Sequence, residues 1–215
     1  MTALSTEAIG ALPPAAPAPR RNVALIGTVF SIAAAAMLIA GLLASYFGAR
    51  QSVAHSGGVW LGPNVHLPNL PLAMAYTSLF MSSFTAQWAV SAIRMNDRRQ
   101  ANIAVGLTLL LAAAFVNGLS FSWGQLHLAA GDGAFADYMY AVTVGHLLLV
   151  LVAVVLFVVM GFRTLGGQFG PRNAEFVQSA AAFWHLAVVA GVAVYWCVWF
   201  LQGGPTSVVV KGVAG

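Results

Sequence analysis

The sequence is poor in charged residues. Only 7% of its 215 residues are charged, whereas soluble domains carry about 25%. A chain this poor in charge cannot cover a surface that faces water on all sides, and 60% of its residues are hydrophobic. The composition therefore predicts an integral membrane protein that forms one compact bundle without a separate soluble domain.

Cysteine and acidic residues are scarce as well. The one cysteine, Cys197, lies inside an apolar run, which excludes a disulfide framework and a CxxC metal site. No His-x3-His pair is present, and the acidic residues all lie outside the apolar runs. These absences argue against a metal site or an acid–base active site inside the membrane. The acidic residues are Glu7, Asp97, Asp132, Asp137 and Glu175.

Five long apolar runs account for most of the chain. Each has about 20 residues or more, enough to cross roughly 30 Å of hydrocarbon as a helix. A backbone in lipid must satisfy its own hydrogen bonds, so these runs are expected to be helical. We predict an all-α, polytopic bundle over residues 23–202, with tails at 1–22 and 203–215. The five predicted transmembrane helices cover residues 23–47, 70–93, 103–123, 138–162 and 176–201.

The basic residues predict an orientation for these helices. Seven arginines fall in the N-terminal tail and in the second and fourth loops, whereas Arg50 and Lys211 fall on the opposite side. Because basic residues concentrate on cytoplasmic loops, we expect a cytoplasmic N-terminus and an outer C-terminus. The net charge of +4 is spread between apolar runs rather than gathered in a patch, so it does not indicate nucleic-acid binding. The seven are Arg20, Arg21, Arg94, Arg98, Arg99, Arg163 and Arg172.

Small and polar residues inside the predicted helices indicate close packing. In the first run, four small residues recur at every fourth position, a spacing that lets helix backbones approach each other in lipid. These residues are Ala36, Ala40, Ala44 and Gly48. Polar side chains of the second and third runs are able to hydrogen-bond across helices, at about 0.6–2 kcal/mol each. They are Ser78, Ser82, Thr85, Gln87 and Asn117.

Two histidines, His146 and His185, lie within predicted helices. Ionisable residues inside a membrane are functional hypotheses by default, and two of them suggest the axial ligands of a b-type haem. The two helices run in opposite directions, which places the imidazoles on the order of 10 Å apart in depth. This offset argues against a shared iron, and a b-haem quinone-linked membrane anchor stays as an alternative. A small transporter is disfavoured because five helices do not divide into two equal repeats.

Four segments, in chain order, resemble one known family. They are "AMLIAGLLASYFGAR" (36–50), "SSFTAQWAVSAI" (82–93), "MYAVTVGHLLLV" (139–150) and "FWHLAVV" (183–189). The last resembles the W-H-F-V-D signature of subunit III of the haem-copper oxidases, the family of cytochrome c and quinol oxidases. The other three are similar to its M-F-F-A-G-L-F-x-x-Y-F-x-x-R, S-S-x-T and T-G-x-H-x-x-H-V segments. Five predicted helices match the short bacterial form of that family.

Three polar positions of the family pattern are apolar in this sequence. A glutamate of the first helix falls on Ala35, the second histidine of the H-x-x-H pair on Leu149, and the aspartate of W-H-F-V-D on Val188. These departures indicate a divergent branch, or a subunit III-like partner of a nitric oxide reductase.

The resemblance implies a non-catalytic subunit without haem or copper of its own. Those cofactors would lie in partner subunits, with catalytic subunit I and subunit II as its neighbours in the bacterial cytoplasmic membrane. It also implies bound phospholipid and support of proton uptake while oxygen is reduced to water. We expect six residues to contact lipid or a neighbouring subunit: His185, Trp184, His146, Gln87, Thr85 and Arg50.

The role predicted for His185 is to order helices or lipid rather than to take part in redox chemistry. Trp196 and Trp199 follow it by 11 and 14 residues, which are close to whole helical turns. We therefore expect both indoles on the face of His185, near the outer membrane interface, where tryptophans gather.

Overall fold

The computed structural model describes residues 23–63, 65–170 and 173–202. Helix α1 spans Val23–His55, α2 spans Asn69–Arg94, α3 spans Arg98–Leu126, α4 spans Ala134–Leu165 and α5 spans Glu175–Val194. The α5 helix continues into a π-helical turn, Tyr195–Trp199, and a 3-10 turn, Phe200–Gln202. The tails predicted at 1–22 and 203–215 lie outside the described residues.

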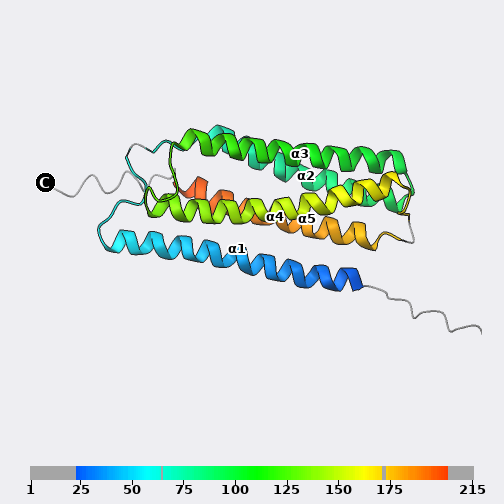
Figure 1. Ribbon diagram of the computed structural model, residues 1–215, viewed down its shortest axis with the longest axis horizontal. Coiled ribbons are helices and arrows are strands. Elements are labelled where there is room, and N and C mark those ends of the chain that lie inside the picture. The colour runs from blue at the N-terminus through cyan, green and yellow to red at the C-terminus, as the bar shows by residue number, and fades with distance from the viewer. Residues whose placement is uncertain (1–22, 64, 171–172, 203–215) are drawn as a thin grey trace, which may run out of the picture.

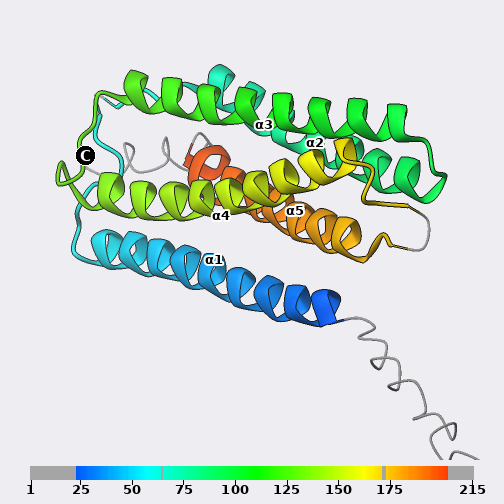
Figure 2. The same cartoon turned by 45° about the vertical axis from the view of Figure 1, so that its right-hand side comes forward.

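Each helix runs antiparallel to the one before it in the chain, and all five lie along the long axis of the molecule (Figures 1 and 2). Helix α2 packs most extensively on α3 and also contacts α5, while α4 contacts α3 and α5. These four helices enclose the core, and α1 lies at the edge of the bundle against α4 and α5. The α3–α4 contact and the α2–α5 contact are thus on different sides of the four-helix core.

The expected all-α fold is confirmed for the described residues, and the helices are consistent with the expected polytopic bundle, although only four of the five expected membrane spans meet both criteria of length and apolarity. Four helical segments are long and apolar enough to cross a membrane: α1, α3, α4 and the continuous helix Glu175–Gln202. Helix α2 has 26 residues, which is sufficient length, but it is less apolar than the other four. The helices also continue past the predicted apolar runs, as in α1, which ends at His55.

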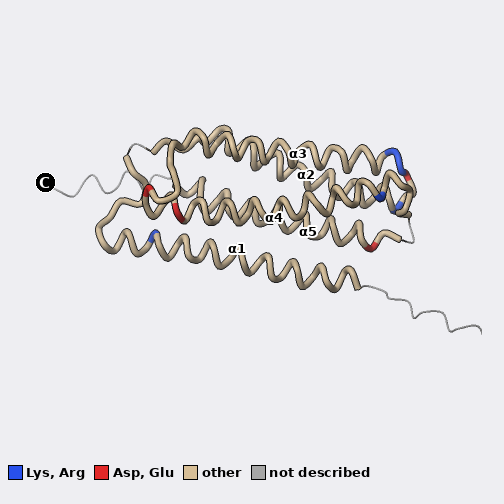
Figure 3. The backbone as a smooth tube through the Cα atoms, in the orientation of Figure 1, with Lys and Arg blue, Asp and Glu red and all other residues tan. Residues whose placement is uncertain are grey.

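The charged residues of the described ranges lie toward the two ends of the bundle, and its middle carries none (Figure 3). Among the described residues, four arginines lie at the end that holds the α2–α3 and α4–α5 connections, and Arg50 lies toward the other end. This separation is the pattern that the sequence predicts for a bundle whose ends face water. The four are Arg94, Arg98, Arg99 and Arg163.

Helices α2 and α3 form the closest pair. Asn96 adopts a left-handed conformation with φ 59° in the turn between them, and Asp97 caps α3 by accepting a hydrogen bond from the Gln100 amide at 3.0 Å. Gly118 of α3 faces α2, where an added Cβ would lie 2.9 Å from the Cβ of Ala75. The missing side chain of Gly118 therefore allows the two backbones to approach closely.

Helix α1 contributes least to the core, since only Ile39 and Tyr46 are buried. The stripe of small residues expected to pack on another helix is exposed in this chain instead. Bulkier side chains of α1 pack against the core on the side of α4 and α5 instead. The exposed stripe consists of Ala36, Ala40, Ala44 and Gly48.

Candidate functional site

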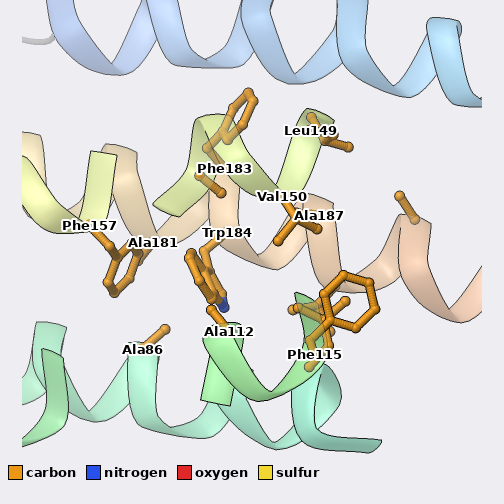
Figure 4. Close-up of a cluster of buried hydrophobic side chains, with 14 of the residues drawn as sticks. Ala86, Ala112, Phe115, Leu149, Val150, Phe157, Ala181, Phe183, Trp184 and Ala187 are labelled. Carbon is orange, nitrogen blue, oxygen red and sulfur yellow. The ribbon is translucent and has the colours of Figure 1, made fainter. Parts of the chain in front are cut away.

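Trp184 anchors α5 in the core against α2 and α4. In Figure 4 its side chain points into the bundle, with Phe157 of α4 and Ala86 of α2 nearby. Only 1% of Trp184 is exposed, and its ring centroid lies 4.6 Å from that of Phe157. The indole N–H donates to Ser82 Oγ at 2.9 Å, and the Ser82 hydroxyl donates to the Leu79 carbonyl at 2.5 Å. The polar atom of this large side chain is thus satisfied inside the bundle.

His185 lies at the border between α2 and α5 and is half-buried. Its Nδ1 is 2.6 Å from Ser83 Oγ, and its Nε2 is 3.3 Å from Gln87 Oε1. Because the Gln87 carbonyl oxygen only accepts hydrogen bonds, Nε2 donates to it. Nδ1 then accepts from the Ser83 hydroxyl, and a neutral imidazole satisfies both contacts.

His146 is fully buried and joins α4 to α5. Its Nε2 donates to the Ala187 carbonyl at 3.0 Å. The ring stacks on Tyr76, with centroids 6.0 Å apart, and meets Phe115 edge-on at 5.6 Å. Gly191 of α5 leaves room for the imidazole, since an added Cβ there would lie 3.0 Å from two of its ring atoms. His146 therefore fixes the contact between three helices and α5.

The two membrane histidines do not form one site. His146 packs against Gly191, whereas His185 precedes Gly191 by six residues and so leaves α5 about 120° around the helix axis. Both ring nitrogens of His185 and one of His146 are hydrogen-bonded to this chain. In the described part of the chain, no three His, Cys, Asp or Glu side chains gather in a metal-binding group. The geometry does not favour the b-haem alternative.

Thr85 and Arg50 occupy different parts of the bundle. Thr85 Oγ1 lies 2.7 Å from Thr108 Oγ1 and links α2 to α3. Arg50 is half-buried near the end of α1, one helical turn beyond Tyr46. The Tyr46 hydroxyl accepts hydrogen bonds from the Trp60 indole, at 3.3 Å, and from the Gln202 amide. The sequence analysis did not predict the hydrogen bonds of Tyr46 to Trp60 and Gln202, although Tyr46 lies within one of the family-like segments.

The opposite end of α1 is tied to α5 by Glu175. The carboxylate oxygen Oε1 accepts hydrogen bonds from the backbone amides of Ala24, at 3.1 Å, and Leu25, at 3.3 Å. The first amides of a helix have no partner within the helix, and they carry the positive end of its dipole. The sequence places Glu175 only among the acidic residues outside the apolar runs, without a role. Its position in the first turn of α5 lets it bind the start of α1.

Trp196 and Trp199 do not share a face, so the expectation of a common aromatic belt is wrong for Trp199. Trp196 is 49% exposed, whereas Trp199 is 2% exposed. Both lie in the π-helical turn Tyr195–Trp199. A π turn adds a residue to the helical repeat, which rotates the end of the helix and turns Trp199 into the bundle.

Two apolar hollows lie between α3 and α4. The larger has a volume of about 860 Å³ and the smaller about 200 Å³, and Leu109 and Val158 line both. Together they follow α3 from Asn102 to Phe121, which is about 28 Å along the helix axis. Their combined length thus approaches the thickness of the hydrocarbon core.

These contacts define a helical membrane bundle whose intramembrane polar side chains hold its own helices together. The family "Cytochrome c oxidase subunit III" matches residues 19–202. A "Probable cytochrome c oxidase subunit 3" of Nocardia farcinica is 29% identical over 187 residues, which cover 85% of this chain and 90% of that relative. The same identity and coverage hold for the "Cytochrome c oxidase subunit 3" of Corynebacterium diphtheriae and the "Probable cytochrome c oxidase subunit 3" of Mycobacterium tuberculosis.

The chain belongs to the cytochrome c oxidase subunit III family. It is therefore a subunit of a respiratory oxidase, embedded in a membrane and in complex with other oxidase subunits. The three positions where family-like segments led us to expect polar side chains are occupied by core residues. Ala35 is half-buried on α1, and Leu149 and Val188 are buried on α4 and α5. These three positions therefore contribute apolar surface to the packing of the bundle.

Proposed function

We propose that this chain is the non-catalytic component of a haem-copper terminal oxidase that stabilises catalytic subunit I. It supports proton uptake while the complex reduces oxygen to water, and the haem and copper reside in its partners, subunits I and II. The observation that supports this role most directly is that His146 and His185 form hydrogen bonds within the bundle. Both are hydrogen-bonded to neighbouring helices, as expected of side chains that order a scaffold.

In this proposal all five helices cross the bacterial cytoplasmic membrane. Helix α2 follows α1 and precedes α3 in the chain, and it runs antiparallel to both. Its 26 residues are enough to cross the hydrocarbon core, so it crosses the membrane with them. The end that carries four of the described arginines faces the cytoplasm, in accordance with the positive-inside rule. This orientation places the N-terminus inside and the C-terminus outside.

The proposal includes bound phospholipid, which we assign to the α3–α4 hollows. Their lining is mostly aliphatic, and their length matches acyl chains that enter from both leaflets. Of the six residues expected to contact lipid or a neighbouring subunit, Trp184 and His146 are buried inside the bundle. Thr85, His185 and Arg50 are half-buried, and Gln87 is exposed.

Purification of the tagged chain from its native membrane in a mild detergent tests this function. Oxidase subunits I and II should co-purify, and the reduced-minus-oxidised haem spectrum should follow them. His185→Ala should reduce the amount of catalytic subunit that co-purifies while the haem content of that subunit stays unchanged. Isolation of this chain alone with its own bound haem would refute the proposal.

A further inference from the structure

Three neighbouring side chains in the core each carry a buried polar atom without a hydrogen-bond partner among the described residues. The atoms are Tyr76 Oη of α2, His146 Nδ1 of α4 and Trp199 Nε1 of the π-helical turn. Tyr76 is 7% exposed, Trp199 is 2% exposed and His146 is fully buried. Buried polar atoms without a partner are costly and rare in folded proteins, so three of them in adjacent side chains point to a ligand.

Ring contacts bring these side chains together. The Tyr76 ring stacks on the His146 ring, with centroids 6.0 Å apart, and the Trp199 side chain faces the Tyr76 hydroxyl. The Tyr76 ring has little freedom to rotate, because it also meets Phe115 and Tyr195 with centroids 5.3 Å away in each case. The hydroxyl of Tyr76 therefore stays close to Trp199 without a direct hydrogen bond of normal geometry.

The other buried polar atoms without a partner in the described ranges lie apart from one another. Asn102 lies near the start of α3 and Ser179 near the start of α5. Trp123 packs on Tyr140, but the Tyr140 hydroxyl is satisfied, since it donates to a backbone carbonyl at 2.8 Å. The group of Tyr76, His146 and Trp199 thus differs from these single atoms.

The three atoms complement one another as donors and acceptors. His146 Nε2 donates to the Ala187 carbonyl at 3.0 Å, so Nδ1 of the neutral imidazole is an acceptor. The Trp199 indole only donates, and the Tyr76 hydroxyl does either. A ligand between them must accept one hydrogen bond and donate another inside a packed core. Water is the smallest molecule that does both, and buried waters make about three hydrogen bonds to otherwise unsatisfied groups.

The π-helical turn Tyr195–Trp199 places the third of these atoms. Such turns insert one residue into the helical repeat and are frequent at functional sites. Within this turn Trp196 is 49% exposed, whereas Trp199 is 2% exposed and its side chain lies by the Tyr76 hydroxyl. An inward rotation that buried an indole N–H without a partner would only destabilise the bundle. A water molecule at this position gives the N–H its acceptor.

We propose that Tyr76, His146 and Trp199 bind one buried water molecule, which joins α2, α4 and the π-helical turn. The Trp199 N–H donates to the water, the water donates to His146 Nδ1, and the Tyr76 hydroxyl makes the third hydrogen bond. His146 lies about 18 Å along α4 from Ala134, at 1.5 Å per residue. Lipid supplies no polar partner at such a depth, so the bundle retains the water as part of its structure.

A density map of the intact oxidase complex, at a resolution that shows ordered water, tests the site directly. We expect a water peak at about 2.7–3.2 Å from Tyr76 Oη, His146 Nδ1 and Trp199 Nε1. Direct hydrogen bonds among the three side chains with no peak between them would overturn the proposal. A map that shows ordered waters elsewhere in the bundle and none at this position would overturn it as well.

Removal of one hydroxyl measures what the water contributes. Tyr76→Phe should raise the unfolding equilibrium constant of the full chain in mixed micelles by about 2- to 12-fold, the effect of one net hydrogen bond. Tyr138→Phe is the matched control, because Tyr138 of α4 is 36% exposed, and it should be neutral. Trp199→Phe combined with Tyr76→Phe should cost less than the sum of the two, since both weaken the same water. Equal stability of Tyr76→Phe and Tyr138→Phe, or strict additivity of the pair, would contradict a shared water.

Discussion

Replacement of Gly191 tests how tightly His146 packs against α5. An alanine Cβ at this position would lie 2.9 Å from Leu79 Cδ2 and 3.0 Å from His146 Cε1 and Nε2. The imidazole has little freedom to move, because its Nε2 is bound to the Ala187 carbonyl and its faces meet aromatic rings. We expect Gly191→Ala to destabilise the bundle.

The magnitude follows from two opposing effects. Inserting a methyl group into a packed core costs about 1–3 kcal/mol. Replacing glycine by alanine inside a helix returns about 0.5–1 kcal/mol. The two ranges leave a net loss between about 0 and 2.5 kcal/mol in the free energy of unfolding. The central value of about 1.2 kcal/mol is roughly an 8-fold change in the unfolding equilibrium.

The assay is equilibrium unfolding of the purified chain in mixed micelles with increasing dodecyl sulfate, followed by tryptophan fluorescence. Gly106→Ala is the matched control, because an added Cβ there meets no atom within 4 Å; it should be neutral or slightly stabilising. In a His146→Ala background the cost of Gly191→Ala should shrink, since only the flexible end of Leu79 then obstructs the added methyl group. Equal stability of Gly191→Ala and Gly106→Ala would refute the reasoning.

Three further substitutions probe single hydrogen bonds. Ser82→Ala should lower the free energy of unfolding by about 1–3 kcal/mol in the same assay, because the buried Trp184 N–H loses its acceptor; an unchanged value would show that another group replaces it. Asp97→Ala removes the cap on Gln100 and should cost about 0.5–2 kcal/mol, with faster hydrogen exchange in the first turn of α3 only. Glu175→Gln keeps an acceptor but removes the charge from the start of α1, so that exchange there should accelerate by about 2- to 5-fold, corresponding to about 0.3–1 kcal/mol. Protection equal to wild type would contradict the charge effect.

The helical bundle was predictable because each helix leaves a continuous local signal. Runs of about 20 apolar residues leave few structures other than transmembrane helices, and the family-like segments lie at their expected places along α1, α2, α4 and α5. For Trp184 and His185, the sequence indicated the segment of α2 that matters but not the residues that they contact. Sequence singled out "SSFTAQWAVSAI", and the structure shows Ser82 and Ser83 of that segment as the two partners.

The features that sequence reasoning missed depend on distant contacts or on a single inserted residue. Glu175 reaches the amide of Ala24 across 151 positions, and Gln202 reaches Tyr46 across 156, and no local pattern links such pairs. The π turn before Phe200 breaks the 3.6-residue period on which the placement of Trp199 depended. One extra residue per turn leaves hydropathy unchanged, so composition gives no sign of it.

Both ends of α1 are held by hydrogen bonds to side chains of the last helical segment, which is synthesised long after α1. Glu175 and Gln202 both lie more than 150 residues downstream of the groups that they bind. At about 5–20 residues per second, the first helix waits on the order of 10 s in the bilayer before its anchors are synthesised. Until α5 is made, α1 has only its packing on α4 to hold it in the bundle, so a chain that stops before α5 lacks both hydrogen-bonding anchors of its first helix.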